Sequence, residues 1–362
     1  MKPLLFVTGH APSYRVGALA RLHEREQIVV ALFGGRAKHG GEVFEGEMPF
    51  PHLHVRPAQL ARLAASREYR AVVCPTGGRL APAAAWAGAR AARVPLILWA
   101  SLWAHPRTLA HAVTYVPLRR LYRTADAVAT YGEHVSAYVR ARGARKVFVA
   151  RQSVDNDFWR GAPPDTEPPG GPARPWPSGT STRFLFVGRN AREKGLDVLL
   201  DAWRASELAR AGASLALVGD GAGGAGVSAA ALRRLGRVTA VELRRIYAEA
   251  DVLVVPSIAT RTFREPWGLV VNEAMNCGTA VIASEAVGAA AGGLVREGVT
   301  GAVVPAGNSA ALGRAMRLLA EDSELRSRYA QAGADAVLEY GHDAWARGFS
   351  EALASVGRSL GR

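Results

Sequence analysis

Short apolar runs alternate with segments of helical periodicity along most of the chain. In the first half the runs read PLLFVTG, QIVVALFGG, AVVCPT, PLILWAS, ADAVATYG and VFVAR, and many of their residues are β-branched or aromatic. Between them, residues 16–26, 57–69 and 133–142 carry apolar positions at helical spacing. This alternation is typical of a parallel β-sheet covered by helices. We therefore predict a doubly wound, Rossmann-like α/β domain over residues 1–160.

A change in composition separates this domain from a second one. Residues 161–182 read GAPPDTEPPGGPARPWPSGTST, where proline and glycine disfavour regular structure, so we expect a linker there. The alternation then resumes with RFLFVG, SLALVG, DVLVVPS, AVIAS and GAVVP, which predicts a second α/β domain over residues 183–340. Helices are expected over residues 323–340 and 342–358. Two such domains are expected to enclose a ligand-binding cleft at the carboxyl ends of their strands.

The positive charge is concentrated in the first half of the chain. Residues 1–160 hold 23 Lys and Arg against 10 Asp and Glu, whereas residues 161–362 hold 22 against 21. A basic half attracts anionic partners such as phosphorylated acceptors or acidic membrane headgroups. We find no helix-turn-helix spacing, zinc-finger pattern or aromatic ribonucleoprotein motif, so nucleic acid is not expected as a partner.

Further sequence features bear on location. The longest apolar stretch, residues 80–104, is interrupted by two arginines and two prolines, so no transmembrane helix is expected. The amino terminus, MKPLLFVTGH, has a short apolar run without a small-residue cleavage site, which predicts a core strand and a cytoplasmic protein. Cys74 and Cys277 lie far apart in apolar contexts, which favours two buried thiols over a disulfide or a metal site.

A glycine triad follows the run SLALV. Gly221, Gly223 and Gly226 spell G-x-G-x-x-G, the spacing of a dinucleotide-binding loop. In that fingerprint the glycines follow the strand directly, and an acidic residue closes the next strand. Here Asp220 intervenes, and Glu242 opens a helical segment instead. We interpret the triad as a turn near a ligand.

Two cations stand in a loop between a predicted strand and helix. In VGRNAREKG, Arg189 follows the strand end at Gly188, and Lys194 precedes the helix. A planar guanidinium fork and a compact ammonium together suit a diphosphate. The alternative is that both are solvated surface charges.

A second candidate anion site lies in FREPWGLVVNEAMNCG. Pro266 suits the first position of a helix, and Gly278 suits the residue just past its end. Backbone amides at this positive helix end would be unpaired and could bind an anion. The amides in question belong to Trp267, Gly268, Leu269 and Val270.

The same stretch contains two glutamates, Glu265 before the predicted helix and Glu273 within it. A nucleotide sugar would fit this order, with its sugar at Glu265, its phosphates at the helix amides and its ribose diol at Glu273. Alternatively, Glu265 is a helix cap and Glu273 an exposed helix residue. Because Glu273 lies among apolar neighbours, where an unpaired carboxylate is costly, we favour a ligand contact.

The segments VGRNAREKG, VGDG, ELRRIYAEADVLVVPS and EPWGLVVNEAMNCGTAVIAS, in this order, resemble the retaining glycosyltransferases of family 4, which have the two-domain GT-B fold. The resemblance spans about residues 183–307. It implies that Glu273 holds the donor ribose, Glu265 contacts the donor sugar, and Arg189 and Lys194 bind the diphosphate. It also implies that Gly219 and Asp220 lie beside the donor nucleotide, and that the helix over residues 341–362 crosses back onto the first domain.

The first domain matches the family less closely. Members often carry paired glycines in the first loop, whereas this chain has GHAPSYRVGALARL, in which Gly17 could let the backbone approach a phosphate and Arg15 could assist. A plain helix start is the alternative. His105 follows a predicted strand and is a candidate contact for sugar or acceptor. His52 and His54 form an H-x-H pattern without acidic or cysteine partners for a metal site, so we expect no metal cofactor.

These features together predict transfer of a hexose from a nucleotide diphosphate sugar to a hydroxyl acceptor, with the retention that the resemblance implies. A lipid-linked saccharide at the inner face of the cell membrane, in cell-envelope or exopolysaccharide synthesis, is the expected acceptor. A small-molecule or natural-product acceptor, a nucleotide-sugar epimerase and a non-catalytic nucleotide-sugar binding protein are the alternatives. A glycoside hydrolase fits poorly, because both glutamates belong to one helix and its entry loop.

Overall fold

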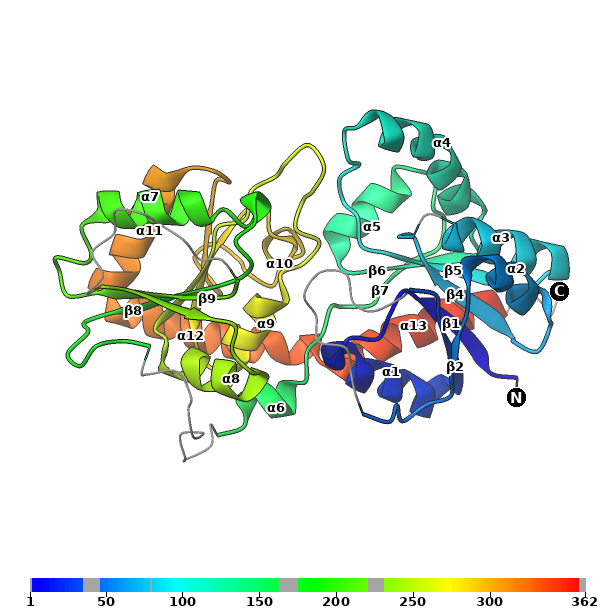
Figure 1. Ribbon diagram of the computed structural model, residues 1–362, viewed down its shortest axis with the longest axis horizontal. Coiled ribbons are helices and arrows are strands. Elements are labelled where there is room, and N and C mark those ends of the chain that lie inside the picture. Colours follow the sequence, from blue (N-terminus) through cyan, green and yellow to red (C-terminus); the bar gives the residue numbers. More distant parts are fainter. Residues whose placement is uncertain (1, 35–45, 79, 163–174, 221–230, 358–362) are drawn as a thin grey trace. The chain divides into compact units, whose positions relative to one another are not determined.

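The computed structural model describes residues 2–34, 46–78, 80–162, 175–220 and 231–357 (Figure 1). The chain divides into two compact units, which are treated separately below. Unit 1 comprises Met1–Asp155 and Tyr340–Arg362, and unit 2 comprises Asn156–Glu339. The glycine triad at 221, 223 and 226 lies outside the described residues, as do residues 163–174 of the predicted linker.

The described part of unit 1 holds a seven-stranded parallel sheet in the order β3-β2-β1-β4-β5-β6-β7. Six of its strands coincide with the predicted apolar runs, whereas β3 was not predicted because its sequence, HLH, is short, polar and exposed. The strands are β1 (Leu4–Thr8), β2 (Ile28–Leu32), β3 (His52–His54), β4 (Ala71–Pro75), β5 (Leu96–Ala100), β6 (Ala127–Thr130) and β7 (Val147–Val149).

Helices cover both faces of this sheet. On one face α1 and α13 share a buried core with inward side chains of the strands. On the other face α2, α3 and α5 form a second core, and Figure 1 shows the two groups on opposite sides. The helices of unit 1 are α1 (Ser13–Glu26), α2 (Pro57–Ala65), α3 (Ala81–Ala92), α4 (Leu109–Thr124), α5 (Glu133–Arg140) and α13 (His342–Gly357).

The C-terminal helix α13 is an integral part of unit 1. Trp345 and Phe349 are fully buried, and their rings lie 5.8 Å and 5.4 Å from the ring of Phe6 in β1. Large aromatic side chains contribute much of the buried apolar area that stabilises a core. The segment after residue 340 therefore completes the cover of the first sheet.

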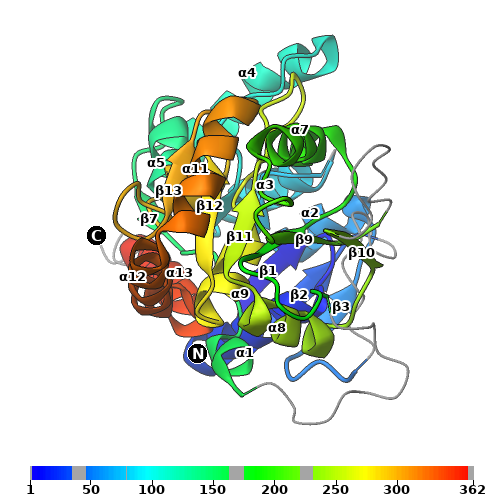
Figure 2. The same cartoon turned by 90° about the vertical axis from the view of Figure 1, so that its left-hand side faces the viewer.

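The described part of unit 2 holds a six-stranded parallel sheet in the order β10-β9-β8-β11-β12-β13, which Figure 2 views from the side of this unit. Strand β10 was not predicted, because its sequence, LRRLG, carries two exposed arginines. The strands are β8 (Arg183–Val187), β9 (Ser214–Val218), β10 (Leu232–Gly236), β11 (Val252–Val255), β12 (Ala280–Ser284) and β13 (Ala302–Val304).

Both figures show α7 and α11 on one face of this second sheet, and α8 and α9 on the other. The helices of unit 2 are α6 (Asn156–Arg160), η1 (Arg192–Lys194), α7 (Leu196–Ser206), α8 (Ala240–Glu249), α9 (Leu269–Asn276), α10 (Gly288–Ala291), α11 (Ser309–Glu321) and α12 (Ser323–Ala336). The short helix η2 (Val337–Tyr340) includes the last residues of unit 2 and the first residue of the second segment of unit 1. None of the helices in the described residues is long and apolar enough to cross a bilayer.

The division of the chain differs from the predicted boundary at residue 160. Helix α6 belongs to unit 2, where the amide of Asn276 donates a 2.9 Å hydrogen bond to Asn156 and the ring of Trp159 packs edge-on against Tyr247. Cys74 is buried as expected, whereas Cys277 is half-buried and donates a hydrogen bond to the carbonyl of Trp159.

Candidate functional site in unit 2

Side chains from two neighbouring strand ends meet in unit 2. Strands β8 and β11 are hydrogen-bonded neighbours, so the loops that leave their carboxyl ends lie side by side. Lys194, after β8, and Glu265, after β11, form an ion pair with 2.5 Å between Nζ and Oε2. The Glu265 side chain is 9% exposed, and its Oε2 also accepts a hydrogen bond from Ser257 at 3.4 Å. The structure thus joins two of the residues predicted to bind donor.

Close backbone packing holds these loops together. A Cβ at Gly195, where φ is +68°, would come within 2.0 Å of the Pro256 carbonyl oxygen. A Cβ at Gly219, with φ of +127°, would come equally close to the carbonyl oxygen of Gly188. Only glycine permits such approaches. The loops after β8, β9 and β11 are therefore packed backbone against backbone, which fixes the position of Lys194.

The charged residues beside this pair are more exposed. The Arg189 side chain is 42% exposed, and its guanidinium lies 3.4 Å from the carboxylate of Glu193. Asp220 receives two hydrogen bonds, of 2.6 Å and 2.5 Å, from Arg237, and these lower the pKa of its carboxyl group. In this structure the Asp220 carboxylate is thus paired with a guanidinium of its own unit.

Helix α9 begins later than the sequence predicts. Its first residue is Leu269 and its N-cap is Gly268, with φ of +91°, so the placement of Pro266 at the first helical position is wrong. The physical reason is an extended entry: Glu265 forms a parallel bridge with Val287, and a Cβ at Gly288 would meet the Pro266 carbonyl at 2.0 Å. Gly278 follows the helix with φ of +75°, as predicted.

The start of α9 carries no side-chain cap. The N-cap glycine cannot supply one, so the amides of Leu269 and Val270 lie at an uncapped helix end, where the partial positive charge favours an anion. Trp267 is buried, and its Nε1 donates a 2.7 Å hydrogen bond to Asn272. This bond ties the entry segment to the first turns of the helix.

Glu273 lies on the second turn of α9, partly buried. Its Oε2 accepts a 2.9 Å hydrogen bond from the hydroxyl of Tyr247 in α8. Burial raises the pKa of Glu273 to about 7, and the hydrogen bond from Tyr247 opposes this rise. Sequence analysis missed Tyr247, although a hydroxyl on the buried side of the predicted helix ELRRIYAEA is a signal that such a side chain needs a partner.

The candidate residues of unit 1 occupy a different environment. Arg15 is 4% exposed, its Nη2 donates a 2.7 Å hydrogen bond to Gln152, and its guanidinium lies 5.3 Å from the ring centres of both Trp99 and Trp345. Its Nη1 has no hydrogen-bond partner among the described residues. An anion beside this atom would satisfy it.

Gly17 has a packing role that the sequence did not reveal. A Cβ on Gly17 would lie 2.5 Å from Cε1 of His342, so α1 and α13 can approach only because residue 17 lacks a side chain. Burial lowers the pKa of His342, which favours its neutral form. Whether Gly17 also approaches a phosphate stays a prediction.

His105 is hydrogen-bonded within unit 1. Its Nε2 lies 2.8 Å from the carbonyl oxygen of His111, which assigns the proton to Nε2, and its Nδ1 lies 3.5 Å from the hydroxyl of Tyr138. Both ring nitrogens thus have partners in this structure. The predicted contact of His105 with sugar or acceptor stays a prediction.

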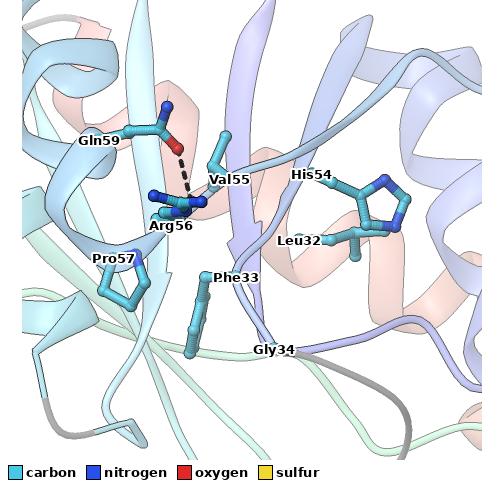
Figure 3. A pocket seen from close by; sticks show the side chains of 8 residues that line it. All are labelled: Leu32, Phe33, Gly34, His54, Val55, Arg56, Pro57 and Gln59. Carbon is cyan, nitrogen blue, oxygen red and sulfur yellow. Dashed lines mark hydrogen bonds between the residues drawn. The ribbon is translucent and has the colours of Figure 1, made fainter.

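A pocket of about 400 Å³ opens at the carboxyl ends of β2 and β3 in unit 1 (Figure 3). Arg56 and Gln59 come from the start of α2, and Phe33 and Gly34 follow β2. The Arg56 side chain is exposed, while its backbone amide donates a 2.7 Å hydrogen bond to Gln59. No group of three or more His, Cys, Asp or Glu side chains in the described residues could hold a metal ion.

Part of this chain is similar in sequence to known glycosyltransferases. Residues 181–322 match the family described as glycosyl transferases group 1. The chain is 38% identical over 162 residues to a phosphatidyl-myo-inositol mannosyltransferase of Mycobacterium leprae, a match that covers 43% of this chain. The match spans 42% of the relative, less than half of its length.

Solved structures resemble the whole chain in fold. Anabaena HepE, in complex with UDP and glucose, superposes with a TM-score of 0.71 at 19% identity, covering 98% of this chain and 100% of that one. Sucrose-phosphate synthase from Thermosynechococcus elongatus gives a TM-score of 0.69 at 16% identity, covering 99% and 100%. At these identities the likeness concerns the fold, and it confirms the predicted GT-B class.

Proposed function

We propose that this chain, whose residues 181–322 match the family described as glycosyl transferases group 1, transfers a hexose from a nucleoside diphosphate sugar to a hydroxyl acceptor with retained anomeric configuration. The observation that carries the proposal is the contact of Lys194 with the buried carboxylate of Glu265, beside the uncapped start of α9. Cations and helix amides suit a diphosphate, and a carboxylate beside them can accept hydrogen bonds from sugar hydroxyls.

The donor diphosphate is proposed to bind Lys194, Arg189 and the first amides of α9. An ammonium group has three donors, so Lys194 can contact a phosphate oxygen while it keeps its bond to Glu265. Glu273 is proposed to accept hydrogen bonds from the ribose hydroxyls. The uncapped helix end adds a favourable electrostatic contribution for the anion.

In the proposed reaction the bond between the anomeric carbon and the diphosphate oxygen breaks, and the electron pair leaves with the diphosphate. The acceptor hydroxyl oxygen bonds to the anomeric carbon, and its proton passes to the departing phosphate, so no side-chain base is needed. Preorganised cations stabilise the charge that develops on the diphosphate, commonly the largest contribution to catalysis. No metal ion takes part in this proposal.

The acceptor is proposed to be a lipid-linked hydroxyl compound of the cell envelope. The basic first half of the chain supports an anionic acceptor, and the mycobacterial relative is named for a phosphatidylinositol acceptor. The pocket at the ends of β2 and β3, which is lined by both apolar and polar residues and includes the exposed Arg56, offers a site on unit 1 for part of such an acceptor.

The test is a thermal-shift screen of nucleoside diphosphate hexoses, followed by NMR of the product formed with phosphatidylinositol and with simple glycosides. Stabilisation by one donor and a product with the donor's anomeric configuration are expected. Inversion, or release of an epimerised donor without transfer, would refute the proposal.

A further inference from the structure

Helix α4 of unit 1 presents an unusual outward face. Val113 is 77% exposed and Val116 is 70% exposed, the two highest values among the large hydrophobic side chains of the described residues. The two valines are three positions apart, so they are neighbours on one helix face. Single exposed apolar residues are ordinary on protein surfaces, whereas an adjacent pair with most of its side-chain surface exposed favours contact with an apolar partner.

The face changes character along the helix. Its exposed positions begin with small, apolar or hydroxyl-bearing residues and end with arginines: Ala112, Val113, Thr114, Val116, Pro117, Arg119, Arg120 and Arg123. The opposite side of α4 is anchored, because Tyr122 is fully buried and Leu118 and Leu121 pack against the core. Figures 1 and 2 both show α4 at the end of unit 1 that lies away from α1 and α13.

The charge around α4 has one sign over a long stretch. From residue 69 to residue 125 the sequence contains eight arginines and no Asp or Glu. The guanidinium of Arg120 lies 5.5 Å from the ring centre of Trp86 in α3, so the basic end of α4 is braced against its neighbour. This segment therefore complements an anionic partner and repels a basic one.

An apolar tip followed by arginines fits one kind of anionic partner in particular. We propose that the outward face of α4 is the surface by which this protein binds an anionic lipid bilayer. Val113 and Val116 enter the headgroup region, and Arg119 with its neighbours contacts lipid phosphates. Nucleic acid would use the arginines and leave the valines in water. This inference rests on the proposed function in one respect: binding to the bilayer would bring the enzyme to a lipid-linked acceptor.

The experiment is flotation of the full-length protein with vesicles. One set consists of phosphatidylcholine alone and the other of phosphatidylcholine mixed with phosphatidylglycerol. The test variants are Val113→Ser/Val116→Ser and Arg119→Glu, all at exposed positions of α4. The matched controls are Val241→Ser/Val299→Ser and Arg314→Glu, which alter exposed residues of the same types in unit 2.

We expect the wild-type protein to bind the anionic vesicles and to bind neutral vesicles more weakly. The double valine variant should lose about tenfold or more in partitioning, because two apolar side chains no longer enter the headgroup region. Arg119→Glu should lose at least about fivefold, since each basic residue near an anionic surface contributes roughly 1 kcal/mol. Both unit 2 controls should bind like the wild type.

Three results would overturn the inference: wild-type protein that does not float with anionic vesicles, a valine variant that floats like the wild type, or controls that lose binding equally. If only Arg119→Glu loses vesicle binding, the arginines of α4 act as a charged patch that would suit other polyanions equally well. This result would refute the proposal that the face of α4 binds a bilayer. Nucleotide binding, measured on the same preparations, separates this outcome from a failure of the proposed function, because the α4 variants should bind nucleotide like the wild type.

Discussion

The hydroxyl of Tyr247 donates a 2.9 Å hydrogen bond to Oε2 of Glu273, and it does so from a fully buried ring. The bond holds the Glu273 carboxylate in place, and we propose that this carboxylate accepts hydrogen bonds from the donor ribose. Burial raises the pKa of Glu273 to about 7, so its ionisation takes place near physiological pH.

Binding of a nucleoside diphosphate sugar should strengthen as pH rises through about 7. The reason is that ribose hydroxyls donate to the ionised form of Glu273, and their bonds are stronger to a carboxylate than to a carboxylic acid. Titration calorimetry between pH 6 and 8 measures the affinity for the nucleoside diphosphate sugar. Because the diphosphate ester of the sugar has no proton that titrates in that range, the change in affinity reports on the protein. In Glu273→Gln the profile should be flat, and an unchanged slope in this variant would contradict the assignment.

Tyr247→Phe should move the midpoint of that pH profile upward. The hydroxyl lowers the pKa of Glu273, so its removal leaves burial unopposed and favours the protonated form. Tyr329→Phe is the matched control, because it removes the hydroxyl of another buried tyrosine of unit 2. A midpoint that moves downward, or equally in both variants, would contradict a specific role for Tyr247.

Glu273→Gln should stabilise unit 2 more at high pH than at low pH. The folded protein holds a proton on Glu273 that the unfolded chain releases, so native stability falls as pH rises from about 4.5 to about 7. Replacement by glutamine removes this loss. Melting temperatures of both proteins across that window test the sign, and a difference that shrinks with rising pH would show that Glu273 is stabilised as a carboxylate.

The ion pair of Lys194 and Glu265 should behave as a coupled unit. Lys194→Met leaves a buried carboxylate without its partner, which costs about 3 kcal/mol in typical cases. Lys194→Met/Glu265→Gln should recover part of that loss, which denaturant unfolding of the two variants would measure. The exposed pair of Arg204 and Asp201 is the control, because Arg204→Met should cost less than about 1 kcal/mol. Additive effects at positions 194 and 265 would argue against the contact.

Gly17→Ala should destabilise unit 1 by about 1–3 kcal/mol, because the new methyl group meets the ring of His342. His342→Ala should relieve most of the clash in the double variant, which thermal melting would detect. If Gly17→Ala instead left the melting temperature unchanged while weakening nucleotide binding, the packing role would be secondary to a ligand role.

The apolar strands of both units were predictable because four or five consecutive buried residues leave a clear signal, as in LLFVT and VLVV. Strands β3 and β10 left none, since HLH and LRRLG are edge strands with exposed polar side chains. The start of α9 was misplaced because proline at a helix start is a statistical preference, whereas a glycine with positive φ at residue 268 ends the extended entry.

The site was predictable as a set of residue types and unpredictable as a set of contacts. Lys194 and Glu265 are 71 positions apart. Their contact follows from the adjacency of β8 and β11, and strand order cannot be read from apolar runs. The same holds for Tyr247 and Glu273, which meet only because α8 and α9 cover the same face of the second sheet.

The most direct test of the central claim is calorimetric titration of the full-length protein with UDP, GDP and ADP and with the matching monophosphates. We predict that one diphosphate binds at a single site, that its monophosphate binds at least about tenfold more weakly, and that Lys194→Met loses a similar factor while Arg314→Gln does not. Both proteins are measured below the melting temperature of Lys194→Met. No binding of any diphosphate, or equal affinity of the wild type and Lys194→Met for the diphosphate, would contradict the account.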